Sequence, residues 1–424
     1  MNMNIAVNCR LLQKGKLEGI GWFMFESLKR ITENHPEHNF YFIFDRQYDD
    51  DFIFGDNVKA IVAGPATRHP LLWYLWFEWR LPTILKRIKA DLFFSPDGYL
   101  SLKSQIPSVP VIHDINFAHR PKDLPFWTRQ YYNYFFPRYA RKADRICTVS
   151  EYSKEDIHNT YKVAKNLIHV VYNGANEKYQ VLDNKTKSSV KQRYTEGDDY
   201  FLFIGSIHPR KNLENLILAY KSFIQKTGSS IKLVVVGASM WKKKGSQTGS
   251  DHAQQNGNVG TLNLGCACTA PGGPGKAQNT LAHSTDPLQD TLKAKYNEPV
   301  FLGRLDQDEL RDILGSALAL TFVPWFEGFG IPVVEAMYAG VPVLTSTETS
   351  LPEVGGDAVL YAHPGSIEEI SDQMEKLAGN PNIRQEMIER GIKRKDHFTW
   401  DKTASNVWAC LEKVIQDIVL KNET

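Results

Sequence analysis

Residues 322–346 read FVPWFEGFGIPVVEAMYAGVPVLTS. The apolar residues at the start of this stretch predict a buried strand. The residues after the glycines predict a helix, with Pro332 in its first turn and Gly340 at its end. Gly328 and Gly330 then lie at the N-terminus of that helix, where unpaired backbone N–H groups and the positive end of the helix dipole meet. Because glycine lets a phosphate approach the backbone closely, this strand, turn and helix predict an anion-binding site.

Two glutamates flank the glycine turn, Glu327 before it and Glu335 inside the helix. A carboxylate accepts hydrogen bonds from pairs of hydroxyls, so one glutamate could hold a sugar and the other a ribose. Glu335 also has a simpler explanation, since an acid near a helix N-terminus stabilises the helix dipole. Glu327 follows the carboxyl end of a strand, where α/β sheets bind their ligands, and this position favours a functional role.

The same strand-then-helix pattern is repeated along the whole chain of 424 residues. Continuous apolar runs that alternate with helical patterns indicate parallel sheets covered on both faces. The pattern restarts after a polar stretch, so the sequence predicts an α/β protein of two doubly wound, Rossmann-like domains that face each other across a cleft. The predicted strands lie at residues 5–8, 40–44, 60–63, 91–95, 109–113 and 146–150, and then at 200–205, 232–237, 300–303, 318–323, 341–346 and 358–361.

The first domain is expected over residues 1–175 and the second over residues 176–399. Residues 245–286 interrupt the second domain with a stretch rich in Gly, Ser, Asn, Gln and Pro, which predicts an irregular insertion. The Cys266-x-Cys268 pair inside it fits no known zinc-finger spacing, so no metal site is predicted.

Composition and charge narrow the classes of protein. The net charge of +2 gives no field that would mark a nucleic-acid-binding protein, so we expect no nucleic-acid partner. Five cysteines, mostly scattered, form no disulfide framework and suit a reducing, cytoplasmic compartment. We expect neither a signal peptide nor a membrane span, since no basic segment with a long apolar run opens the sequence and no apolar run is long enough to cross a bilayer.

A second turn suited to phosphate lies at 204–212, IGSIHPRKN, where a strand ends and a helix begins. Arg210 offers a planar fork of donors and Lys211 a point charge, and together they could neutralise a diphosphate. A solvated basic turn is the alternative. Two phosphate-suited turns in one domain make a shared binding site the better explanation.

The first domain contributes two weaker candidates. His113 and Asp114 end a buried strand and could face the cleft, although a helix cap or a buried structural histidine is also compatible with the sequence. Gly19 and Gly21 form a G-x-G turn before the helix expected at 22–34, and an ordinary turn is an equally good explanation.

Together these segments resemble the retaining glycosyltransferases of the GT-B fold, specifically glycosyltransferase family 4, which includes many bacterial mannosyltransferases. The resemblance covers nearly the whole chain apart from residues 245–286. Its most specific part is the pair Glu327 and Glu335 with seven residues between them. Further similar segments are PRKNLENLI (209–217), TVSEYSKEDI (148–157), VYNGANEKY (171–179) and SLPEVGGDA (350–358).

The resemblance implies a role for each candidate residue. Glu327 would contact hydroxyls of the donor sugar, and Glu335 would hold the ribose of the nucleotide. Arg210 and Lys211 would bind the diphosphate and stabilise the leaving group, and His113 would lie near the donor sugar across the cleft. Further donor contacts would come from Gly19, Gly21, Ser206, Arg304, Leu305, Gly328, Phe329, Gly330 and Ile331.

The resemblance also bears on the acceptor side. No dedicated base is expected, and Asp114 is the cleft acid that we would test there. No metal or other cofactor is implied, and the helix expected near 400–424 would cross back onto the first domain. Ser206 stands where many family members have arginine, so Arg210 would carry more of the diphosphate.

The implied substrates are a nucleotide-diphosphate sugar, with GDP-mannose first and UDP-sugars next, and a saccharide or lipid-linked saccharide of a surface polysaccharide. An inactive sugar-nucleotide-binding protein on the same fold is the alternative. A Rossmann oxidoreductase would need a G-x-G-x-x-G fingerprint that the glycine turns do not complete. Residues 70–90, PLLWYLWFEWRLPTILKRIKA, are either a buried helix of the first domain or a peripheral contact with the inner face of the plasma membrane.

Overall fold

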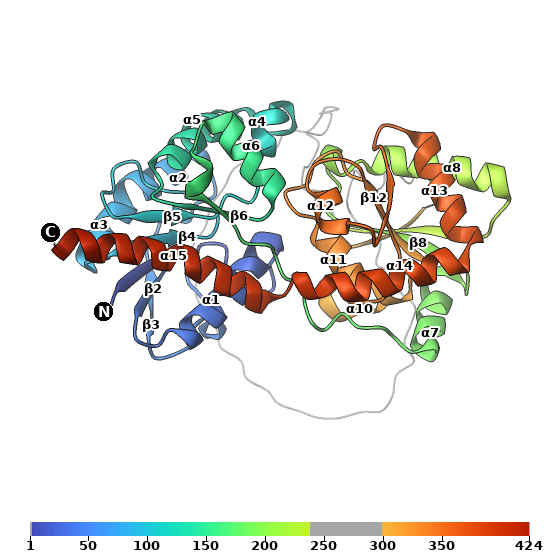
Figure 1. Cartoon of the computed structure of the whole chain (residues 1–424), viewed down its shortest axis with the longest axis horizontal. Coiled ribbons are helices and arrows are strands. Elements are labelled where there is room, and N and C mark those ends of the chain that lie inside the picture. The colour runs from blue at the N-terminus through green and yellow to red at the C-terminus, as the bar shows by residue number, and fades with distance from the viewer. Residues whose placement is uncertain (1, 238–298, 424) are drawn as a thin grey trace, which may run out of the picture.

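The computed structural model describes residues 2–237 and 299–423, and it shows two parallel sheets, each covered by helices (Figure 1). The sheet of the first domain has the strand order β3-β2-β1-β4-β5, and an isolated parallel bridge from Val111 to Cys147 continues it into the β6-β7 pair. Its strands are β1 (Asn4–Asn8), β2 (Asn39–Phe44), β3 (Val58–Val62), β4 (Leu92–Ser95), β5 (Ser108–Pro110), β6 (Ile146–Thr148) and β7 (Ile168–Val170).

The sheet of the second domain has the order β10-β9-β8-β11-β12-β13. Every residue of β8 and β11 is buried, as expected for central strands with helices on both faces. The strands are β8 (Tyr200–Ile204), β9 (Lys232–Val236), β10 (Val300–Gly303), β11 (Ala319–Phe322), β12 (Val343–Ser346) and β13 (Leu360–Ala362).

Helices connect the strands in both domains. Those of the first domain are α1 (Gly19–Asn34), η1 (Asp50–Phe52), α2 (Pro70–Leu75), η2 (Trp76–Arg80), α3 (Leu81–Arg87), α4 (Asn116–His119), η3 (Pro121–Asp123), α5 (Phe126–Lys142), α6 (Glu151–Tyr161) and η4 (Lys165–Leu167). Those that follow are α7 (Asn184–Thr195), η5 (Pro209–Lys211), α8 (Leu213–Thr227), α10 (Gln307–Ser316), α11 (Ile331–Tyr338), α12 (Leu351–Gly355), α13 (Ile367–Gly379), α14 (Pro381–Arg394), η6 (Lys395–His397) and α15 (Trp400–Glu423).

Alternation along the strands gives the first domain a core on each face of its sheet. Ile5 and Val7 of β1 pack into one buried cluster, whereas Ala6 between them packs into the other. The second domain has one large cluster that includes β8, β9 and β11. This arrangement confirms the predicted fold of two Rossmann-like domains with parallel sheets.

The final helix, α15, runs back from the second domain onto the first (Figure 1). Arg30 of α1 pairs with Asp401 at 2.5 Å, and the Thr403 hydroxyl donates to the Tyr172 carbonyl at 2.6 Å. Trp400 lies against Gly174, where a Cβ atom would come within 2.5 Å of the Trp400 backbone nitrogen. The chain therefore crosses between the domains twice, and the two crossings touch.

Three details differ from the sequence-based expectations or lie beyond them. Helix α1 begins at Gly19 rather than at residue 22, so Gly19 and Gly21 belong to its first turn and not to a preceding loop. Strand β7 was not predicted, because its three residues carry too short an apolar run. The insertion at 245–286, with Cys266 and Cys268, lies outside the described residues. Among the described helices, none is both long and apolar enough to cross a membrane.

Candidate active site

The glycine turn and the basic turn lie side by side because their strands are neighbours. The basic turn follows β8 and the glycine turn follows β11, and these strands pair in parallel. The strand order changes direction between β8 and β11, since β9 and β10 lie on one side and β12 and β13 on the other. Such a switch point opens a crevice at the carboxyl edge of a sheet, where ligands of doubly wound domains bind.

Asn212 ties the two turns together. It takes a left-handed backbone conformation with φ of +62°, which asparagine tolerates better than most residues. Its amide donates to the carbonyl oxygens of Val323 at 3.0 Å and Pro364 at 2.7 Å. The Trp325 N–H also donates to the Arg210 carbonyl at 2.8 Å. The basic side chains are thereby held against the glycine turn.

A buried cluster of charge joins the two turns. Arg210 Nη1 lies 2.8 Å from Glu327 Oε1, and Lys211 Nζ donates to the same carboxylate oxygen. Glu327 and Lys211 are only 8% and 9% exposed, so these charges are largely removed from water. Two cations share one carboxylate, and the cluster keeps a net positive charge that suits a further anion.

The pKa shifts in this cluster have opposing causes. Burial acts to raise the pKa of Glu327, but Arg210 and Lys211 outweigh it and hold that pKa below its usual value. Burial acts to lower the pKa of Arg210, yet Glu327 raises it overall. The pKa of Lys211 is lowered, because burial and the charge of Arg210 oppose the attraction of Glu327. A second negative partner beside Lys211 would therefore favour its charged form.

Two serines fix the backbone of the glycine turn. The Ser350 hydroxyl lies 3.0 Å from the Glu327 carbonyl oxygen and 3.1 Å from that of Phe329. The Ser150 hydroxyl, from the first domain, donates to the Gly328 carbonyl at 2.7 Å. In a trans peptide the next N–H points opposite to the carbonyl. The N–H groups of residues 328–330 thus point away from these serines, in fixed directions.

The first domain presents His113 in the loop between β5 and α4, because the strand ends at Pro110 and not at residue 113 as predicted. Its Nε2 lies 2.9 Å from the Pro96 carbonyl oxygen, which can only accept, so Nε2 carries the proton. Burial lowers the pKa of His113, which favours the neutral ring with Nδ1 as an acceptor. The ring lies nearly perpendicular to that of Phe23 in α1, with the centroids 4.9 Å apart. Asp114 Oδ1 accepts the N–H of Asn116 at 3.0 Å, so one oxygen of this acid holds the local turn.

The two domains touch at the glycine turn. A Cβ atom on Gly328 would lie 2.5 Å from the His113 carbonyl oxygen and 2.9 Å from the Asp114 Cβ atom. Nearby, the Glu353 carboxylate accepts the N–H of Glu151 at 2.8 Å and that of Tyr152 at 3.1 Å, and so caps α6 from the other domain. Glycine at 328 is thus required by the close approach of the first domain.

Glu335 lies half-buried in α11, the helix that begins after the glycine turn. Burial raises the pKa of its carboxyl to about 7, and the nearby Tyr179 hydroxyl offsets part of this effect. The Glu335 side chain is therefore divided between its neutral and charged forms near neutral pH.

The other residues implied by the resemblance lie in different surroundings. Gly19 faces Ile331, with a built Cβ atom 3.6 Å from Ile331 Cδ1, and Arg304 lies 3.6 Å from Glu18 on the same rim. Gly21 is buried, and a Cβ atom there would meet Leu17 at 3.1 Å. Ser206 is half-buried directly after Gly205, and Leu305 packs against the core of the second domain. The Phe329 ring is buried beside Tyr172 and Phe398.

Sequence reasoning assigned no role to several residues that shape this site. Ser150, Ser350 and Glu353 hold the glycine turn or join the domains, and Tyr179 adjoins Glu335. All four lie in segments that were noted only for their resemblance to the family. The resemblance of these segments to the family therefore pointed to the right residues. It could not show what each side chain contacts, because each partner comes from a distant part of the chain.

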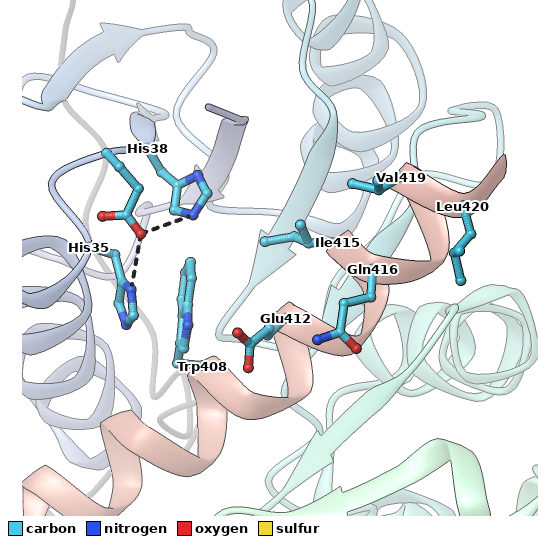
Figure 2. Close-up of a pocket in the computed structure, with 9 residues that line it drawn as sticks. His35, His38, Trp408, Glu412, Ile415, Gln416, Val419 and Leu420 are labelled. Carbon is cyan, nitrogen blue, oxygen red and sulfur yellow. Dashed lines mark ion pairs between the residues drawn. The ribbon is translucent and has the colours of Figure 1, made fainter. Parts of the chain in front are cut away.

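A hollow of about 720 Å³ lies elsewhere, between α15 and the turn after α1 (Figure 2). There, the His35 ring stacks on Trp408 with the centroids 3.7 Å apart, and Glu37 lies 3.5 Å from His35 and 3.4 Å from His38. None of the predicted site residues lines this hollow. We place the candidate site at the switch point instead, where cations, the glycine turn and the strand ends converge.

Comparison with known proteins agrees with this placement. The family described as "Glycosyltransferase Family 4" matches residues 32–179, and "Glycosyl transferases group 1" matches residues 184–262 and 289–394. O-antigen chain mannosyltransferase B of Escherichia coli is 24% identical over 401 residues, which cover 92% of this chain and 94% of that protein. O-antigen chain mannosyltransferase RfbU of Salmonella typhimurium is 24% identical over 309 residues, or 73% of this chain and 71% of that protein.

Solved structures share the fold at low sequence identity. WaaG, a glycosyltransferase involved in lipopolysaccharide biosynthesis, superposes with a TM-score of 0.66 at 15% identity and covers 95% of this chain and 98% of its own. Anabaena HepE, solved with UDP and glucose, gives a TM-score of 0.66 at 14% identity over 97% of this chain and 100% of its own. With the two family descriptions covering most of its length, the chain belongs to the family 4 glycosyltransferases of the GT-B fold.

Proposed function

We propose that this glycosyltransferase moves a hexose, mannose in the first instance, from a nucleotide-diphosphate sugar to a saccharide or lipid-linked saccharide, with retention of configuration. The observation that carries the proposal is the buried Glu327, held by Arg210 and Lys211 opposite the His113 turn of the other domain. The two relatives described above are named O-antigen chain mannosyltransferases, which supports mannose and a surface polysaccharide as the product.

The diphosphate is the leaving group, and it departs with negative charge that must be stabilised. In the proposed complex, Arg210 and Lys211 supply two positive charges from the protein, and the fixed N–H groups of residues 328–330 add dipoles. This arrangement performs the task that a divalent cation performs in other transferases, so we propose that the reaction needs no metal. Glu327 would then be paired less closely with Arg210 and Lys211, and its carboxylate would accept hydrogen bonds from hydroxyls of the donor sugar.

The acceptor hydroxyl is proposed to attack from the face that the diphosphate leaves, and its proton would pass to the departing phosphate oxygen. The bond from the anomeric carbon to the phosphate oxygen breaks as the new glycosidic bond forms. No protein base is required. His113 would accept a hydrogen bond from a sugar hydroxyl at Nδ1 and so orient the sugar ring. Asp114 remains the acid to test on the acceptor side.

The nucleoside is proposed to lie along the second domain. Glu335 would hold the ribose, and the turn that contains Arg304 and Leu305 would meet the base. Gly19 and Ile331 form the facing rim, where a Cβ atom on Gly19 would lie 3.6 Å from Ile331 Cδ1. The chain would act in the cytoplasm beside the membrane that carries a lipid-linked acceptor.

Nucleotide release from a panel of GDP-, UDP- and dTDP-sugars tests this proposal and names the donor. We expect release with one donor, above all GDP-mannose, and we expect Glu327→Ala to abolish it. The alternative is an inactive sugar-nucleotide-binding protein. A nucleotide that raises the unfolding temperature, without turnover when saccharide and lipid-linked acceptors are supplied, would favour that alternative.

A further inference from the structure

One outward surface of the first domain is apolar where a solvent-exposed surface should be polar. Helices α2, η2 and α3 follow one another without a break, and Trp76, Phe77 and Leu81 bury one face. The opposite face exposes Leu71, Tyr74, Leu75 and Trp79, with Trp79 59% exposed. The expectation that residues 70–90 pack as buried helix therefore holds for one face of these elements, and the other face is exposed.

Helix α5 extends this apolar surface. Trp73 stacks on Tyr132 with the centroids 5.7 Å apart, and Tyr74 lies 6.1 Å from Phe135, so α2 and α5 are packed side by side (Figure 1). On its outward side, α5 exposes three more large side chains: Phe126, Trp127, which is 67% exposed, and Tyr134. Of the twelve exposed large apolar side chains among the described residues, seven thus gather on α2, η2 and α5.

Cations lie directly over these exposed rings. Lys103 Nζ is 3.4 Å from the centroid of Trp79, and the Arg138 guanidinium carbon is 3.6 Å from that of Tyr134. Helix α5 carries Arg129, Arg138, Arg141 and Lys142 and no acidic residue. The single acid of α2, η2 and α3 is Glu78, which is buried and accepts the N–H groups of Leu102 and Lys103. We call the outward side of α2, η2 and α5, with Lys103, the aromatic–basic surface.

We propose that the aromatic–basic surface binds the face of a bilayer that contains anionic lipids. Exposed Trp and Tyr rings settle at the level of lipid headgroups, and neighbouring Lys and Arg side chains attract anionic headgroups. The surface combines both features and presents no accessible acid on its helices. A protein partner would require particular acidic groups opposite each cation, whereas an anionic lipid layer supplies negative charge at every position.

The aromatic–basic surface belongs to the domain that contacts the glycine turn of the candidate site. His119 of α4, just before α5, stacks on Phe326 with the centroids 5.9 Å apart, and Phe326 directly precedes Glu327. Helix α4, which precedes η3 and α5 along the chain, therefore reaches the candidate site from the domain that carries this surface. A lipid-linked acceptor would reach this site from the bound membrane. This last step rests on the proposed function, but the lipid contact does not.

Co-sedimentation of the full chain with vesicles tests the proposal. We expect binding to vesicles of phosphatidylcholine with phosphatidylglycerol at low salt, and weaker binding to phosphatidylcholine alone or at high salt. Trp79→Ser with Trp127→Ser should weaken vesicle binding by about tenfold or more, because both anchors are lost. Leu71→Ser should weaken it as well. Leu420→Ser, at a leucine of the same 61% exposure outside this surface, should not.

The outcomes separate the two proposals. Wild-type protein that stays in solution with anionic vesicles would overturn the lipid contact, as would full vesicle binding by the double tryptophan variant. The unfolding temperature of each variant should match the wild type, because the substituted side chains are exposed, and the wild-type comparison of lipids holds even if a variant unfolds. The same wild-type preparation is tested for nucleotide release, so vesicle binding without release would fault only the proposed reaction.

Discussion

Gly328→Ala tests the contact between the domains. The added Cβ atom would lie 2.5 Å from the His113 carbonyl oxygen, whereas a carbon and an oxygen atom need about 3.3 Å. Because the clash is with backbone, the glycine turn and the His113 turn must separate by about 0.8 Å. Misplacement of this size can reduce catalysis by about 10²-fold. We therefore expect kcat/KM for sugar transfer to fall by about 10²-fold, measured with saturating acceptor and the donor that the panel identifies.

A matched control is available in the same domain. Gly379, at the end of α13, has no atom within 4 Å of a built Cβ atom, so Gly379→Ala should leave kcat/KM unchanged. The unfolding temperature reports whether either substitution perturbs the fold. Wild-type kcat/KM in Gly328→Ala would refute the reasoning, because the turns would then not need this contact in the reacting state.

Three further predictions concern ionisation and stability. The affinity for a nucleotide sugar should rise about tenfold from pH 6 to pH 8, because the Glu335 carboxyl, with its pKa of about 7, loses its proton over this range. The charged carboxylate then accepts hydrogen bonds from the ribose hydroxyls more strongly. Titration calorimetry measures this dependence on pH, which should vanish in Glu335→Gln. Asn212→Asp should lower the free energy of unfolding by about 2–4 kcal/mol in urea denaturation, because two buried carbonyl oxygens lose their donor and face a carboxylate, and an unchanged midpoint would contradict this. Gly174→Ala should destabilise the docking of α15 by about 1–3 kcal/mol, seen as a lower unfolding temperature, because its Cβ atom would clash with the Trp400 backbone.

Much of this architecture could be predicted from local sequence. Apolar runs such as β8 and β11 are long enough to identify as strands, and the turns after them contain the glycines and cations that identify an anion site. The strand order could not be predicted from residue patterns. It is the pairing of β8 with β11 that brings Lys211 to Glu327, two residues that are far apart in the sequence.

Contacts between the domains could not be predicted from the sequence either, because they also depend on residues that are far apart along the chain. Ser150 caps α6 within its own domain, but its hydroxyl also donates to the Gly328 carbonyl, and Glu353 accepts N–H groups at the N-terminus of α6. Helix α1 begins earlier than expected, at Gly19, although glycine is usually a poor helix former. A Cβ atom on Gly21 would lie 3.1 Å from Leu17, which leaves little room for a larger residue. Tertiary packing therefore decided what local preference left open.

The central claim is that the buried pair of Lys211 and Glu327 belongs to the transfer site, and Lys211→Ala tests it most directly. With the active donor, kcat/KM for this variant should fall by about 10²–10³-fold, since one cation that stabilises the leaving diphosphate is removed. Lys226→Ala, which removes an exposed lysine paired with Asp372 at 2.8 Å in the same domain, should retain wild-type kcat/KM. Equal kcat/KM in both variants and the wild type would contradict the assignment of this site.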